Sequence, residues 1–124
     1  MNDKTPTPTE IRARSAAREL FVRFDNGEEF TLPFEYLRVY SPSAEVTGHG
    51  GPRLLIAGKE NVGVKAIEPV GQYAIRIVFD DGHDSGLYSW RILHELGTDF
   101  EKNWREYTAK LEKAGMRRNE GQEP

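Results

Sequence analysis

The segment FDDGHDSGLYSW, residues 79–90, gathers the side chains of this sequence that are best suited to chemistry. Asp80, Asp81 and Asp84 surround the imidazole of His83. Such a histidine can bind a metal ion through one ring nitrogen, with a carboxylate as a second ligand or orienting group. The same residues also describe a hairpin, because Asp-Gly is strong turn chemistry. In that interpretation Asp80 and Asp84 bond nearby amides and His83 makes one structural hydrogen bond. The apolar residues that follow then fill the core: Leu87, Tyr88 and Trp90.

A second histidine, His49, lies in the loop SPSAEVTGHGGP. Between glycines it is either an ordinary loop residue or the partner of His83 in a two-histidine site. Imidazole ligands would favour nickel, copper or zinc there. The chain contains no cysteine, which excludes disulfides, thiolate nucleophiles and every cysteine-ligated metal site.

Catalytic motifs are absent from the sequence. It contains no P-loop, no G-x-G-x-x-G, no G-x-S-x-G and no H-x-D pair of the kind that binds iron in non-haem oxygenases. His94-Glu95 is not followed by the second histidine of H-E-x-x-H. We therefore expect that this protein is not an enzyme and needs no cofactor.

Composition narrows the class of protein further. The 17 basic and 20 acidic side chains give a net charge of −3, which does not indicate a nucleic-acid partner. No apolar run approaches the length of a membrane span, and the start MNDKTPTPTE has no signal-peptide core. We expect a cytoplasmic protein with no membrane or nucleic-acid partner. Residues 1–9 predict a flexible leader, 10–115 a single domain and 116–124 a flexible tail.

The segment ELFVRFDNGEEFTLP predicts a β-hairpin that turns at Asn26-Gly27. A three-residue loop with a bulge pairs Val22 with Phe30 and keeps apolar side chains on one face, whereas a two-residue loop does not. The preceding EIRARS predicts a further edge strand, although SAAREL is also compatible with a helix. FEYLRVYS then predicts a short helix.

Two strands, VGVKAI and YAIRIVF, follow the glycine-rich loop. In the second strand, one face carries Tyr73, Ile75, Ile77 and Phe79 and the other is also apolar, which indicates a central position in its sheet. After the DDGH turn, SGLY predicts a short strand.

Two helices end the chain. The first is expected over SWRILHEL and should end at Gly97, which would act as a left-handed cap. Thr98 and Glu101 match a capping box at the start of the second helix. That helix carries an apolar stripe that we expect to pack in the core: Phe100, Trp104, Tyr107 and Leu111. Gly115 is expected to end it. The fold class is α+β: an antiparallel sheet with hairpins, packed against short helices and a C-terminal helical pair.

The order of these motifs resembles a known family. L-P-x-x-x-L-R at 32–38 precedes S-P-S at 41–43, a strand, and D-G-H-x-S-x-x-Y-x-W at 81–90. This combination is similar to the γ-butyrobetaine hydroxylase-like N-terminal domain family, over roughly residues 10–97. The resemblance implies a short free-standing bacterial domain of unknown function.

The resemblance implies a comparison with the related domain of carnitine-pathway hydroxylases. That domain holds a zinc ion through three cysteines in C-x-C-x-x-C and through the histidine of D-G-H. The cysteine positions correspond here to Ser41, Ser43 and Val46, and the histidine to His83. A neutral hydroxyl is a weak zinc ligand and valine has no donor atom. One ligand of the set is therefore kept, and any metal at His83 would lie in a degenerate site.

We predict a non-catalytic binding module that acts through an unidentified partner protein. Related domains accompany oxygenases and iron–sulfur carriers, which by analogy indicates oxygenase or iron–sulfur metabolism. The residues predicted to bind line the loop and the turn: Ser41, Ser43, His49, Asp81, His83, Asp84 and Tyr88. The alternative is a metal-binding protein that uses His83 and His49. A third hypothesis, a component of a carnitine-pathway oxygenase, has less support, because we expect 124 residues to be too few to include the catalytic domain as well.

Overall fold

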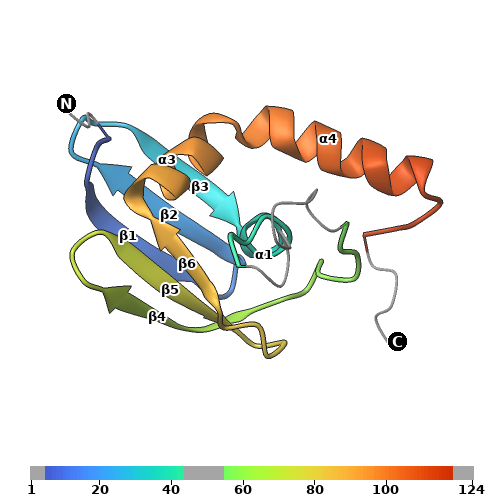
Figure 1. Cartoon of the computed structure of the whole chain (residues 1–124), viewed down its shortest axis with the longest axis horizontal. Helices are drawn as coiled ribbons and strands as arrows, with labels where there is room; N and C mark the ends of the chain where they lie inside the picture. The colour runs from blue at the N-terminus through green and yellow to red at the C-terminus, as the bar shows by residue number, and fades with distance from the viewer. Residues whose placement is uncertain (1–4, 44–54, 119–124) are drawn as a thin grey trace.

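The strands form two three-stranded antiparallel sheets, which we call the first and the second sheet (Figure 1). The computed structural model describes residues 5–43 and 55–118. The first sheet has the order β1-β2-β3 and the second β4-β5-β6, so the predicted α+β class is confirmed. The elements are β1 Pro8–Arg14, β2 Glu19–Phe24, β3 Glu29–Pro33, α1 Phe34–Val39, β4 Val64–Val70, β5 Ala74–Phe79, β6 Gly86–Ser89, α3 Trp90–Thr98 and α4 Phe100–Lys113.

The predicted bulged hairpin is confirmed in the first sheet. Val22 pairs with Phe30, and Leu20 with Leu32. Gly27 has a φ of 91°, a left-handed conformation that glycine adopts without steric strain. This register buries Leu20, Val22 and Leu32 on one face, as the apolar pattern requires.

The segment before this hairpin forms a strand, not a helix. β1 pairs with β2 over its length, with Ile11 opposite Val22. Arg18 turns the chain with a φ of 54°. Because β1 ends the strand order, the second edge of this strand is not paired within the sheet.

The second sheet has β5 at its centre, as predicted. Ile75, Ile77 and Phe79 are buried on its inner face. The placement of Tyr73 on that face was wrong: β5 begins at Ala74, and Tyr73 is 74% exposed in the preceding turn. The tyrosine lies beyond the paired region, where alternation no longer directs a side chain inward.

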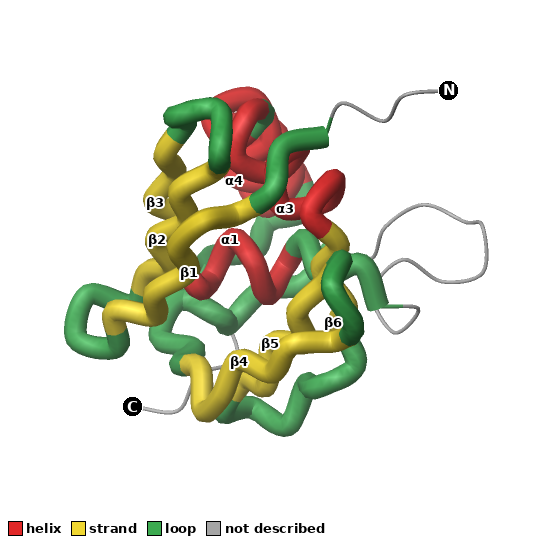
Figure 2. Tube along the Cα trace, turned by 90° about the vertical axis from the view of Figure 1, so that its left-hand side faces the viewer, coloured by secondary structure: helices red, strands yellow, loops and turns green. Residues whose placement is uncertain are grey.

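One core joins both sheets and the first two helices. Figure 2 shows α1 between the two sheets. The residues buried in this core come from β2, β3, α1, β5, β6, α3 and the segment before β4: Leu20, Val22, Phe24, Leu32, Phe34, Tyr36, Leu37, Val62, Ile75, Ile77, Phe79, Tyr88, Leu93 and Leu96. A smaller cluster beneath α4 contains Val39, Tyr107 and Leu111, which confirms the predicted apolar stripe of that helix.

The predicted junction between the two C-terminal helices was wrong. Gly97 does not cap α3 but lies inside it, and a Cβ there would come within 2.5 Å of the Phe30 ring. Glycine is therefore required for packing. The N-cap of α4 is Asp99, with no side-chain capping bond, so the Thr98 capping box does not form. The end of α4 is as predicted, because Gly115 has a φ of 73° and donates to Glu112.

Within residues 5–43 and 55–118, no helix has the length and apolar character that crossing a bilayer requires.

Candidate functional site

The D-G-H segment forms the turn between β5 and β6. Phe79 N donates to His83 O at 2.9 Å, and Gly82 has a φ of 92°. Asp81 Oδ1 accepts from His83 N at 3.1 Å, a local amide bond that the hairpin interpretation had given to Asp80 and Asp84. Asp80 Oδ1 instead accepts from Gly63 N at 3.0 Å, which lies 17 positions earlier, just before β4. Asp81 therefore holds the backbone of this turn, and Asp80 connects the turn to the segment before β4.

The imidazole of His83 points into the protein and is 4% exposed. Its Nε2 lies 2.8 Å from Oγ of Ser41, which is completely buried. Ser41 Oγ also accepts from Ser43 N at 3.2 Å, and Ser43 Oγ lies 2.7 Å from Ser85 Oγ. We call these four residues the polar cluster. It joins the segment after α1 to the turn before β6, two segments far apart in the sequence.

Two neighbours determine the shape of the polar cluster. Tyr88 is completely buried, and its hydroxyl donates to Leu37 O at 2.5 Å. At Gly86, a Cβ would lie 2.6 Å from Ser41 Oγ, so a larger residue would displace the serine. The roles of Ser85 and Gly86 could not be predicted from the sequence, because no local pattern indicates that they face a segment some 40 positions away.

A group of charges covers the turn from outside. Asp81 Oδ2 accepts from Arg38 Nε at 2.8 Å and lies 2.6 Å from Lys59 Nζ. Burial alone would raise the pKa of Asp81, but the bonds from Lys59, the His83 amide and Arg38 outweigh it and lower the pKa to about 2. Arg38 Nη1 is buried and has no hydrogen-bond partner among the described residues. These cations hold Asp81 ionised.

The predicted binding residues are thus divided by the fold. The buried members are Ser41, Ser43, His83 and Tyr88. The side chain of Asp81 is 18% exposed in its ion pairs. Asp84 is the exposed member, with 59% of its side chain in solvent and a carboxylate oxygen 3.8 Å from Arg76 Nη1. His49, like Val46, lies outside the described residues. Whether any of these residues binds a partner stays a prediction.

A zinc ion does not fit the donors that the described residues offer. His83 Nε2 is bonded to the Ser41 hydroxyl, and Ser43 bonds Ser85. Neutral hydroxyl groups are weak zinc ligands, and catalytic or structural zinc sites use three or four stronger ones. In the described part of the chain, no three residues among the histidines and acidic groups are arranged to hold a metal ion.

The surface beside the turn is the outer face of the second sheet. Figure 2 shows the helices on the opposite side of this sheet. Arg76 lies at the centre of the face, where it bonds Glu68 at 2.5 Å and donates to Asp84 O at 3.1 Å. Leu87, paired with Arg76 across the sheet, is 48% exposed, and Val70 is 39% exposed.

Comparison with known proteins agrees with this fold. The model of the family described as gamma-butyrobetaine hydroxylase-like, N-terminal, matches residues 11–94. One protein solved in solution by NMR is 45% identical, with a TM-score of 0.83, covering 96% of this chain and 94% of its own. A second NMR structure is 49% identical, with a TM-score of 0.81 and coverage of 95% and 90%.

A crystal structure from Acidithiobacillus ferrooxidans is 35% identical, with a TM-score of 0.65, covering 77% of this chain and 98% of its own. It is described as a protein with unknown function that belongs to the DUF971 family. No curated protein matches. The family match covers well over half of the residues, and the motifs around the turn fall within it. The chain therefore belongs to the gamma-butyrobetaine hydroxylase-like, N-terminal, family.

Proposed function

We propose that this protein is a non-catalytic module that binds a partner protein through the outer face of the second sheet, beside the D-G-H turn. One observation carries the proposal. Among the described residues, Val70 and Leu87 are exposed large hydrophobic side chains on this outer face. Tyr73, which is also exposed, lies at the end of the sheet in the β4–β5 turn, beside Thr7 and Trp90. Apolar side chains gathered on one uncovered face are typical of a protein-interaction surface.

The charges on this face favour a specific contact. Arg76 bonds both Glu68 and the Asp84 carbonyl, so its guanidinium is held in one place next to Leu87. Arginine beside an apolar side chain is common at the centre of protein interfaces. In this proposal Asp84, the exposed residue of the turn, lies at the rim.

The polar cluster has a supporting role in this proposal. Its imidazole, His83, is buried against Ser41, and the neighbouring Asp81 is held as a carboxylate by two cations, so neither side chain is presented to a substrate. General acid–base catalysis needs such a group within reach of a substrate. The cluster instead fixes the turn that leads into β6, and so fixes the position of Leu87.

The metabolic context of the partner is proposed from the family alone and not from the site. Related domains accompany oxygenases and iron–sulfur carriers, so we propose a partner from that metabolism. The experiment is quantitative affinity capture from extract of the source cells. Leu87→Glu should lose a partner that the wild type retains, because a carboxylate would be desolvated at the centre of the contact. Thr31→Glu, which adds the same charge on an exposed position of β3, is the matched control.

Retention of every captured protein by Leu87→Glu would contradict the proposed surface. Equal loss in both variants would indicate a charge effect and not a specific contact. Circular dichroism of each variant establishes that the fold is kept, since both substitutions are at exposed positions.

A further inference from the structure

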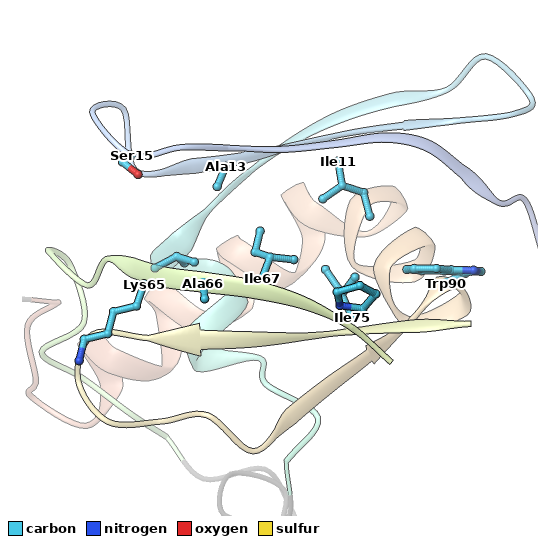
Figure 3. Close-up of a pocket in the computed structure, with 10 residues that line it drawn as sticks. Ile11, Ala13, Ser15, Lys65, Ala66, Ile67, Ile75 and Trp90 are labelled. Atoms are coloured by element: carbon cyan, nitrogen blue, oxygen red, sulfur yellow. The ribbon is translucent and has the colours of Figure 1, made fainter. Parts of the chain in front are cut away.

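A groove of about 540 Å³ opens between β1 and β4, on a different side of the molecule from the outer face of the second sheet (Figure 3). Side chains from both sheets point into it. Ile11 and Ala13 enter from β1, Ile67 from β4, and Ile75 and Trp90 lie at its base. The lining is therefore largely apolar, and the core beneath it is closed by Ile75, which is 4% exposed.

Both strands that border the groove are edge strands. β1 ends the first sheet and β4 ends the second, so alternate backbone amide and carbonyl groups of each point away from their own sheet. The edge of β4 is irregular, with a register shift between Val64 and Ala66 and a proline at Pro69. β1 pairs regularly from Glu10 to Arg14. It is therefore the better template for another strand.

The side chains of β1 alternate between two environments. Ile11 and Ala13 line the groove, whereas Arg12 and Arg14 lie on the other face with 64% and 41% of their side chains exposed. Each arginine is paired with a glutamate of its own sheet, Glu10 or Glu19. Exposed ion pairs of this kind are weak, so an incoming carboxylate can compete for the guanidinium groups.

We propose that an extended segment of a partner protein binds as an additional strand along β1, with apolar side chains in the groove and acidic side chains beside Arg12 and Arg14. Backbone hydrogen bonds would provide affinity, and the alternating side chains would provide specificity. Opposite charges on neighbouring strands stabilise such pairing. This site goes beyond the proposed function, because it uses a separate surface and a separate mode of recognition.

The test uses two capped eight-residue peptides, one alternating valine with glutamate and one alternating valine with lysine. Each is titrated to about 1 mM against the whole isotope-labelled protein, a range that detects weak binding. The glutamate peptide should shift amide signals of β1 and β4 and leave those of α4 unchanged. The lysine peptide should bind about tenfold more weakly or worse, because like charges oppose pairing.

Two variants locate the contact. Ala13→Glu places a carboxylate at the exposed mouth of the groove, where the valines of the peptide would desolvate it, and should weaken binding of the glutamate peptide about tenfold. Ala109→Glu makes the same change on the exposed side of α4 and should have no effect. The proposal is overturned if the glutamate peptide does not bind, or if Ala13→Glu binds it as well as the wild type does. It is also overturned if the amide signals of β1 shift only with protein concentration, which would indicate pairing with a second copy. Leu87→Glu should leave peptide binding intact, so this result is separable from the proposed function.

Discussion

At the scale of single residues, His83 and Asp81 of the D-G-H segment bond other parts of the same chain. The His83 imidazole faces inward and bonds Ser41, while Asp81 holds the turn and two cations. A histidine beside aspartates is compatible with both a reactive site and a turn, and the difference is burial. That property depends on residues distant in the sequence.

Ser41→Ala should lower the free energy of unfolding by about 1–3 kcal/mol, because it removes a hydrogen-bonding group that faces the buried His83 ring. Urea denaturation measures this change. Ser15→Ala, at an exposed turn position, should have little effect. Equal stability of Ser41→Ala and wild type would show that the bond does not hold the two segments together.

The depressed pKa of Asp81 predicts a pH dependence of stability. Its pKa is about 2 in the folded protein against an ordinary value of 3.8, so its stabilising effect is fully present above pH 3.8 and is lost as pH falls towards 2. Asp81→Asn should be less stable than wild type at pH 6, and the difference should shrink below pH 3.8. Asp84→Asn, altered at an exposed carboxylate, should show no such convergence. Denaturation series at each pH provide the comparison.

At the scale of elements, local sequence patterns predicted the strands well. They did not predict the role of residues that depends on tertiary packing. The Val22–Phe30 register follows from alternation and turn chemistry, which are both local. Gly97 was misinterpreted because glycine at the end of an apolar period normally marks a cap. Its true reason is the Phe30 ring, which lies on a strand more than 60 positions earlier.

Gly97→Ala separates these two interpretations. Intrinsic helix propensity would make alanine more stabilising by about 1 kcal/mol, whereas the contact with the Phe30 ring makes it destabilising. We expect a net loss of stability in thermal or urea unfolding. In a Phe30→Ala background the sign should reverse, since the ring is gone. A stabilising Gly97→Ala in the wild-type background would refute the packing explanation.

At the scale of the whole molecule, the two sheets share one core but expose different surfaces. The inner faces are buried together with α1 and α3, which leaves the outer face of the second sheet and the edges of β1 and β4 uncovered by helices (Figure 2). The sequence predicted the elements and the family. It could not predict which residues of the candidate site are buried, because burial follows from how the sheets meet.

The end of the described chain is attached to the body of the molecule. Arg118 bonds both carboxylate oxygens of Glu35, at 2.6 and 3.1 Å, and its guanidinium lies 5.3 Å from the Trp104 ring centre. Glu35 is 4% exposed. Arg118→Ala should therefore destabilise the protein by about 1–3 kcal/mol, because it leaves a buried carboxylate without its cation.

Glu35→Gln in the Arg118→Ala background should recover part of that loss, because it removes the unpaired charge. Urea denaturation of the two single variants and the double variant measures the coupling. Strictly additive losses would show that the ion pair contributes nothing.

The central claim is that the polar cluster is an internal cross-link and not a chemical centre. The most direct measurement is the ¹⁵N signal of His83 Nε2 in protein purified without an affinity tag, recorded before and after one equivalent of zinc. We predict that zinc leaves the ¹⁵N signal of Nε2 unchanged and that this signal shows coupling through the hydrogen bond to Ser41. Stoichiometric zinc in the purified protein, or a zinc-dependent shift of Nε2, would contradict the account.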